Sequence, residues 1–221
     1  MLQPLDFPYY LELQKRLEEA FLFVACNEKN FGTHSIKIEN LFVDNCAFFE
    51  SLIQSFVLEL YHSGHKFIYQ SQITDFQKKI DGHKHFSIAD YRVLLENEFD
   101  LAKKELNLNS YEEDYFGNPQ AIILPAKING YKIRPLEKWN DNKNPLWWNA
   151  FTKLKHNRLK NIKRATLKNL VNSVGATFLI LTIKNEKQFK LGKVPEEIYN
   201  VFYPKYWTFK GRASRGVVKW H

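Results

Sequence analysis

The feature that most constrains this fold is a run of apolar side chains that recur every three or four residues. The run continues for about six turns and ends at Ser63-Gly64, which predicts one long helix with a single apolar face. Its apolar positions are Ile38, Leu41, Phe42, Phe49, Leu52, Phe56 and Leu60. Asn45 lies in the middle of that face, where an amide needs a hydrogen-bond partner. Such a helix has to be covered by other helices.

Three more segments show helical spacing, at residues 8–30, 88–106 and 146–184. Ser87 is a candidate N-cap for the second of them, with Asp90 three positions later as in a capping box. A short helix is expected at residues 196–203. The sequence therefore predicts a mainly α fold, with a bundle of four to five helices.

One short stretch predicts β structure instead. Asn129-Gly130 lies between alternating residues, which favours a two-residue β-hairpin with strands at about 121–128 and 131–134. After residue 185 the chain carries prolines, glycines and scattered aromatics. We expect residues 1–185 to form the helical bundle and residues 186–221 to form an irregular basic extension packed on the same domain.

The composition is that of a folded chain in a reducing compartment. Of the 221 residues, 44% are hydrophobic and 15% aromatic, far from the composition of disordered chains. Cys26 and Cys46 are too few for a disulfide framework or a thiolate zinc site. The amino terminus lacks the features of a signal peptide, and the longest apolar run, residues 20–26, is too short to span a bilayer. These patterns predict a cytoplasmic protein without a membrane partner.

Positive charge is concentrated in the last third of the chain. Residues 1–150 carry 16 basic and 21 acidic side chains, whereas residues 151–221 carry 16 basic and only 3 acidic ones. No acid occurs between Asp141 and Glu186. Such a segment is typical of a surface that binds nucleic acid, or of one that docks on acidic side chains of the same fold.

The helix expected after Pro145 divides into two faces. At about 100° per residue, a polar and mainly cationic stripe runs along one side, and we expect its cations to bind nucleic acid. The stripe consists of Lys153, Asn157, Lys160, Arg164 and Lys168. The opposite, apolar side consists of Trp148, Phe151, Leu159, Ile162, Ala165 and Thr166.

Lys155 and Arg158 share the apolar side, and His156 lies between the two faces. A half-buried cation needs a partner, so we expect at least one carboxylate or amide from the 38–60 helix to meet these two heads. The candidate partners are Glu39, Asn45 and Glu59. The alternative is that both side chains lay their stems on the aromatics and keep their heads in water.

The order of these segments resembles a set of bacterial HEPN-like helical proteins over roughly residues 10–185. Their shared feature is a W-W-x-x-Y-N-x-x-K-H-x-R segment that opens a long helix. Here it reads Trp147, Trp148, Phe151, Thr152, Lys155, His156 and Arg158. Phe151 and Thr152 depart from the Tyr-Asn of the pattern, and the Arg-x4–6-His signature of the nucleases in that superfamily has no arginine at positions 149–151.

The resemblance implies a helical bundle, dimerisation through the motif helix, and RNA binding with metal-independent cleavage in stress or phage defence, alongside a partner protein of a defence system. In that case His156 would act as general acid or base, and Lys155 and Arg158 would neutralise charge at the phosphorus. Trp148, Asn45 and Glu39 would support them. No metal or other cofactor is expected. The alternative is a catalytically inactive HEPN-like module that binds nucleic acid or protein.

Two other constellations compete with this interpretation. His62, His65, His83 and His85 lie near glycines and could meet as metal ligands, but no acid or cysteine spacing completes the set. Arg215 and His221 form the only literal Arg-x5-His in the chain, and a chance spacing is the simpler explanation of it.

Overall fold

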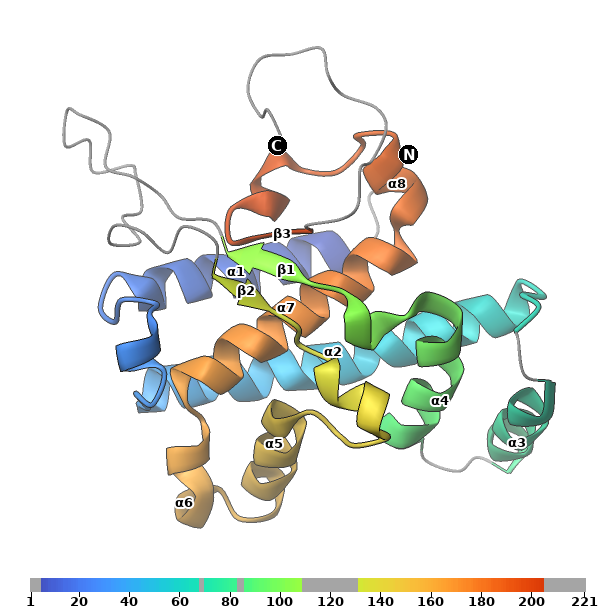
Figure 1. Ribbon diagram of the computed structural model, residues 1–221, viewed down its shortest axis with the longest axis horizontal. Helices are drawn as coiled ribbons and strands as arrows, with labels where there is room; N and C mark the ends of the chain where they lie inside the picture. Colours follow the sequence, from blue (N-terminus) through green and yellow to red (C-terminus); the bar gives the residue numbers. More distant parts are fainter. Residues whose placement is uncertain (1–4, 68–69, 83–85, 109–130, 205–221) are drawn as a thin grey trace.

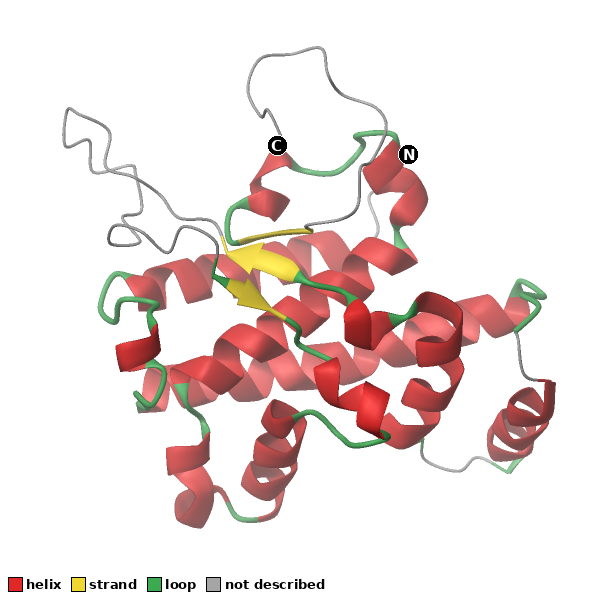
Figure 2. Cartoon of the chain, viewed as in Figure 1, coloured by secondary structure: helices red, strands yellow, loops and turns green. Residues whose placement is uncertain are grey.

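The protein is mainly helical, with a small antiparallel sheet on one side (Figures 1 and 2). This computed structural model describes residues 5–67, 70–82, 86–108 and 131–204. The helices are α1 (Asp6–Phe21), α2 (Ile36–His62), α3 (Gln70–Asp81), α4 (Ile88–Phe99), α5 (Leu146–His156), α6 (Arg158–Asn161), α7 (Leu167–Lys184) and α8 (Glu186–Lys190). Single 3-10 turns occur at Glu28–Asn30, Leu101–Lys103, Glu137–Asp141, Ile162–Arg164 and Glu196–Tyr199.

Two long helices, α2 and α7, form the centre of the bundle. They pack along each other more extensively than any other pair of described elements, and α1 and α5 each contact both. Ser35 caps α2 by accepting from the Ile38 N–H. The predicted inward amide, Asn45, is fully buried and accepts a hydrogen bond from Thr177 Oγ1 of α7 at 3.0 Å. The long helix expected at residues 38–60 is confirmed.

The sheet lies across α7 (Figure 1). Its strands are β1 (Leu106–Leu108), β2 (Lys132–Ile133) and β3 (Phe202–Pro204), in the order β2-β1-β3, with both pairs antiparallel. The strand expected at 131–134 is therefore present, but it pairs with β1, whose first residue, Leu106, was expected to end the 88–106 helix. The segment expected to be its partner, residues 121–128, lies outside the described residues, as do Arg215 and His221.

Three of the predicted helices differ from the structure in their bounds or type. The first helix ends at Phe21, and a 3-10 turn capped by Asn27 follows where helix was expected to continue. α4 begins with the predicted Ser87–Asp90 capping box, but it ends at Phe99 because Asp100 adopts a left-handed conformation with φ of 49°. Residues 196–203 form a 3-10 turn and the start of β3 rather than one helix. The helix α3 was missed.

The described part of the extension packs on the bundle. Phe189, Ile198 and Phe202 are buried in the common core, and Gln14 Nε2 of α1 donates to the Glu197 carbonyl at 2.6 Å. Cys26 and Cys46 are both buried and free of a disulfide, and burial raises the pKa of the Cys26 thiol to about 12. These contacts tie residues 186–204 to the helices at the level of α1 and α7.

Gly175 lets the sheet approach α7. A Cβ there would lie 2.6 Å from Ile133 Cδ1 of β2 and 3.4 Å from Leu106 Cδ1 of β1. We expect Gly175→Val to lower the free energy of unfolding by about 1–3 kcal/mol through overpacking. Gly32→Val is the matched control, because nothing lies within 4 Å of a Cβ at Gly32. Urea denaturation of both variants checks this, and equal stabilities would contradict the close packing.

Candidate nucleic-acid interface

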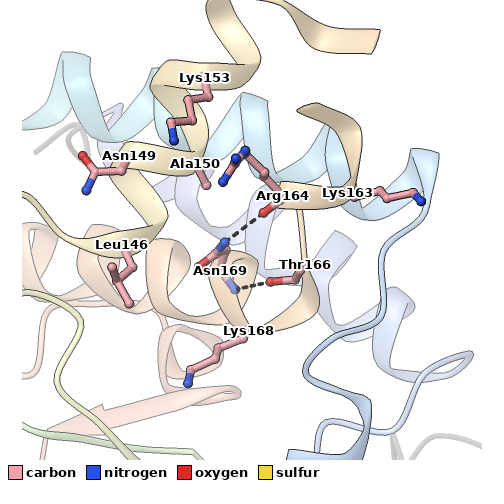
Figure 3. Close-up of a pocket in the computed structure, with 9 residues that line it drawn as sticks. All are labelled: Leu146, Asn149, Ala150, Lys153, Lys163, Arg164, Thr166, Lys168 and Asn169. Carbon is pink, nitrogen blue, oxygen red and sulfur yellow. Dashed lines mark hydrogen bonds between the residues drawn. The ribbon is translucent and has the colours of Figure 1, made fainter. Parts of the chain in front are cut away.

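A groove of about 540 Å³ lies between α5 and the start of α7, and four of the side chains around it are cations (Figure 3). Its lining residues are Leu146, Asn149, Ala150, Lys153, Lys163, Arg164, Thr166, Lys168 and Asn169. None of the nine is acidic. The groove therefore concentrates positive charge at one end of the bundle.

The four cations have no acidic partner in the part of the chain that the structure describes. Within the described residues, Lys153, Lys163, Arg164 and Lys168 form no ion pair, although other cations of the same segment do. Arg164 Nε donates to Asn161 Oδ1 at 3.0 Å, so its position is fixed without its charge being neutralised. A set of cations held apart from acids has its charge available to an external anion.

The groove exists because the helix expected over residues 146–184 is broken. Asn157 takes an extended conformation, with φ of −156° and ψ of 89°, and its side chain caps α6 by accepting from the Lys160 N–H. Asparagine competes with the helical backbone in this way. Thr166 then caps a new helix, α7, by accepting from the Asn169 N–H. The expectation of one continuous helix was wrong.

Asparagine side chains hold the walls of the groove together. Asn161 Nδ2 donates to the Lys153 carbonyl at the end of α5, while its Oδ1 holds Arg164. Asn169 Nδ2 donates to the Arg164 carbonyl at 2.8 Å, an interaction visible in Figure 3. These hydrogen bonds connect α5, the 162–164 turn and α7, and so fix the cations relative to one another.

The backbone at the start of α7 offers no free donor to a ligand. The Leu167 N–H donates to the Thr33 carbonyl at 2.8 Å, and the Lys168 N–H donates to the Phe31 carbonyl at 3.1 Å. The Asn169 and Leu170 N–H groups both bond to Thr166. Anion binding in this groove would therefore rely on side-chain donors. The α7 dipole would add electrostatic attraction but no backbone hydrogen bond.

Lys155 and Arg158 meet carboxylates of α2, as predicted. Lys155 Nζ lies 3.2 Å from Glu50 Oε2 and 5.0 Å from the centre of the Phe151 ring. Arg158 pairs with Glu39 and with the Asn40 side chain, and the hydrogen bond to Glu39 raises the pKa of Arg158. Both cationic side chains are 53% exposed, however. Their heads lie at the rim of the α2 interface rather than in the core.

The other residues named from the sequence have different surroundings. Glu39 is buried beneath Arg158, with 2% of its surface exposed, whereas Asn45 contacts Thr177 and Glu59 contacts Lys184. His156 is the exposed last residue of α5 and has no hydrogen bond or ion pair within the described residues. The structure therefore does not bring His156, Lys155 and Arg158 together in the groove.

Trp148 belongs to the core, and Leu159 does not. Trp147 and Trp148 are 2% and 8% exposed; Trp147 packs edge-on against Phe49 and Trp148, and Trp148 meets Phe49 at a tilt. Leu159, expected on the buried side, is 90% exposed because α6 turns away from the axis of α5. The Trp-Trp pair of the motif therefore anchors the start of α5 in the core.

Of the four cations expected to bind nucleic acid, three line the groove. Lys153, Arg164 and Lys168 do so, and Lys160 does not. Lys163 was missed, because on a continuous helix it falls outside the cationic stripe. The sequence signal that could have found it is the absence of acids from the whole segment, together with the capping residue types at positions 157 and 166.

The histidines do not form a metal site in the described part of the chain, where no group of three or more potential ligands occurs. His65 lies 3.2 Å from Glu98 and its ring packs near Phe67 and Phe99. His83 and His85 lie outside the described residues.

One described helix, α2, is long and apolar enough to cross a bilayer, with a window of mean hydropathy 1.3. Half of that window is buried inside the protein. This helix is also the one that packs most closely on α7, so its apolar character matches its place in the centre of the bundle.

Comparisons with known proteins give no relative for this chain: no protein-family model, no curated protein and no solved structure matches it.

Proposed function

We propose that this protein binds nucleic acid, RNA in particular, through the basic groove between α5 and α7. The observation that carries the proposal is a groove whose described lining holds four cations and no acid, with none of the four in an ion pair to another described residue. Neutralising phosphates with such side chains releases counterions and provides affinity independent of sequence.

The arrangement of the cations favours a polymer over a small phosphate ligand. In Figure 3, Arg164 points towards α5, near Ala150 and Lys153, while Lys163 and Lys168 extend outwards in different directions. A pocket for a single phosphate would aim its donors at one point. Cations that fan out over a surface suit successive phosphates of a chain.

The resemblance to HEPN-like proteins supports RNA as the ligand and adds the rest of the proposal. It suggests a cytoplasmic homodimer that associates through the motif helix and acts in stress or phage defence, with a partner protein. The pairing of Lys155 with Glu50 and of Arg158 with Glu39 favours the binding module over the nuclease, because cations engaged with carboxylates are less available to a phosphorane.

RNA cleavage is the second candidate function, and the position of His156 favours it. This histidine is exposed and follows Lys153 of the groove by three residues on α5, so the two lie on one side of the helix. A general acid or base needs such access to a bound strand.

We expect binding to RNA to weaken steeply with salt. For four phosphate contacts, the slope of log K against log salt concentration should be about −3 to −4. Arg164→Gln should make the slope shallower by about 1. Fluorescence anisotropy with a labelled RNA of mixed sequence, from 50 to 200 mM salt, measures both.

Lys187→Gln is the matched control for charge. Lys187 is an exposed residue of α8, the helix that follows α7. Because α7 has 18 residues, its end lies about 27 Å from its start, where the groove is. This variant loses the same charge and should bind as the wild type does. No binding at low salt, or an equal loss in both variants, would contradict a site in the groove.

A further inference from the structure

We infer that the groove takes the sugar–phosphate backbone of a duplex rather than a single strand. This inference rests on the proposed function and specifies its ligand. Three features support it: the groove offers cationic side chains, the backbone N–H groups at the start of α7 are already hydrogen-bonded, and the aromatic rings of α5 are buried.

The aromatic residues nearest in sequence to the groove are not available to bases. Trp147, Trp148 and Phe151 of α5 are 2%, 8% and 2% exposed. Trp147 Nε1 donates to the Pro135 carbonyl at 2.8 Å, and its ring meets Phe49 edge-on at 5.1 Å. These rings are fixed on the core side of α5, whereas Asn149 and Lys153 face the groove (Figure 3).

The groove itself contains no aromatic ring among its described lining residues. Its apolar members are Leu146 and Ala150, and the rest are cations, two asparagines and a threonine. Proteins that hold single strands combine a basic channel with aromatic platforms on which bases stack, and each stacked base adds about 1–3 kcal/mol. Without such platforms, the groove can contact phosphates and sugars but gains little from unpaired bases.

A duplex compensates for the lack of stacking. It carries one charge per about 1.7 Å of axis, against about 3.4 Å along one of its strands, so cations that fan outwards meet more phosphates. A duplex is also already ordered, whereas a flexible strand loses conformational freedom when it binds. The outward spread of Lys163 and Lys168 around Arg164 fits phosphates on more than one line.

The test compares ligands of one length and sequence on the full chain. The probes are a labelled 20-nucleotide RNA without self-complementarity, the same RNA as a duplex, and the corresponding DNA duplex, each measured by anisotropy at low salt. We expect the RNA duplex to bind about 10-fold more tightly than the single strand, as its higher charge density predicts. Arg164→Gln should weaken duplex binding several-fold, and Lys187→Gln should not.

The outcomes separate this inference from the function on which it rests. A single strand that binds as tightly as the duplexes overturns the duplex inference and leaves nucleic-acid binding in place. Absence of binding by all three probes overturns both. If the duplexes bind more tightly but Arg164→Gln has no effect, the duplex site is not in this groove. Whichever duplex binds more tightly identifies the backbone, RNA or DNA, that the groove takes.

Discussion

Lys184→Met is expected to lower the free energy of unfolding by about 2–4 kcal/mol, because it removes a buried cation from between two acids. The Lys184 side chain is only 7% exposed, and its Nζ lies 2.8 Å from Asp6 Oδ2 and 2.9 Å from Glu59 Oε1. It also donates to Ser55 Oγ at 2.9 Å. This cluster joins the start of α1 to the ends of α2 and α7.

Methionine keeps the length of the side chain but leaves the two carboxylates facing each other without a cation. The loss should fall short of the full cost of orphaning a buried charge, since the Asp6 and Glu59 side chains are 21% and 59% exposed and water can solvate them in part. Urea denaturation, followed by far-ultraviolet circular dichroism, measures the change in midpoint and slope.

Lys190→Met is the matched control for this variant. Lys190 pairs with Glu186 on α8, but both side chains are more than half exposed, and such pairs contribute about 0–1 kcal/mol. A similar small change in both variants would mean that the Lys184 cluster does not hold the helix ends together.

The sequence was sufficient for the central helix and for one helix start. Apolar spacing of about 3.6 residues locates α2 because that helix is covered from Ile38 to Val57, so most of its turns carry the pattern. The capping box at Ser87 and Asp90 locates the start of α4 because capping is a local interaction. Both signals can be read from the local sequence alone.

The break at Asn157 could not be found from periodicity. Spacing arguments assume a continuous helix, and the stretch around Asn157 keeps helical residue types on both sides of the break. The chain leaves the helix there because side-chain caps at Asn157 and Thr166 compete with the backbone pattern. The position of α6 then depends on Arg158 meeting the buried Glu39, a long-range contact that sequence order alone does not fix.

The same break explains why only part of the predicted cationic stripe lines the groove. Lys153 and Arg164 were expected on one stripe, and they do share a surface, but across a groove between two elements rather than along one helix. Because the chain folds back after α5, Lys163 lines the groove and Lys160 does not. The absence of acids over the segment was the more robust signal, because it does not depend on helix geometry.

If the protein cleaves RNA without metal, as the second candidate function proposes, His156→Ala is expected to lower the rate by about 10²–10⁴, the usual contribution of a general acid or base. RNA affinity should change no more than a few fold, because in this proposal the groove cations Lys153 and Arg164 bind the phosphates while His156 transfers the proton. The exposure of His156 and its position three residues after Lys153 on α5 support this role. The assay is incubation of labelled RNA with purified protein in EDTA.

His62→Ala is the control, since His62 is also the exposed last residue of a helix, α2, but is not among the residues that line the groove. It should cleave as the wild type does. Both variants should also melt like the wild type by circular dichroism, because neither exposed histidine fills the core.

Arg158→Ala would be a poor substitute for this test, because it leaves the buried Glu39 carboxylate without its cation. If wild type and His156→Ala are equally inert on structured, single-stranded and transfer RNA, the cleavage hypothesis is wrong, and nucleic-acid binding through the groove is the function that the unpaired cations support.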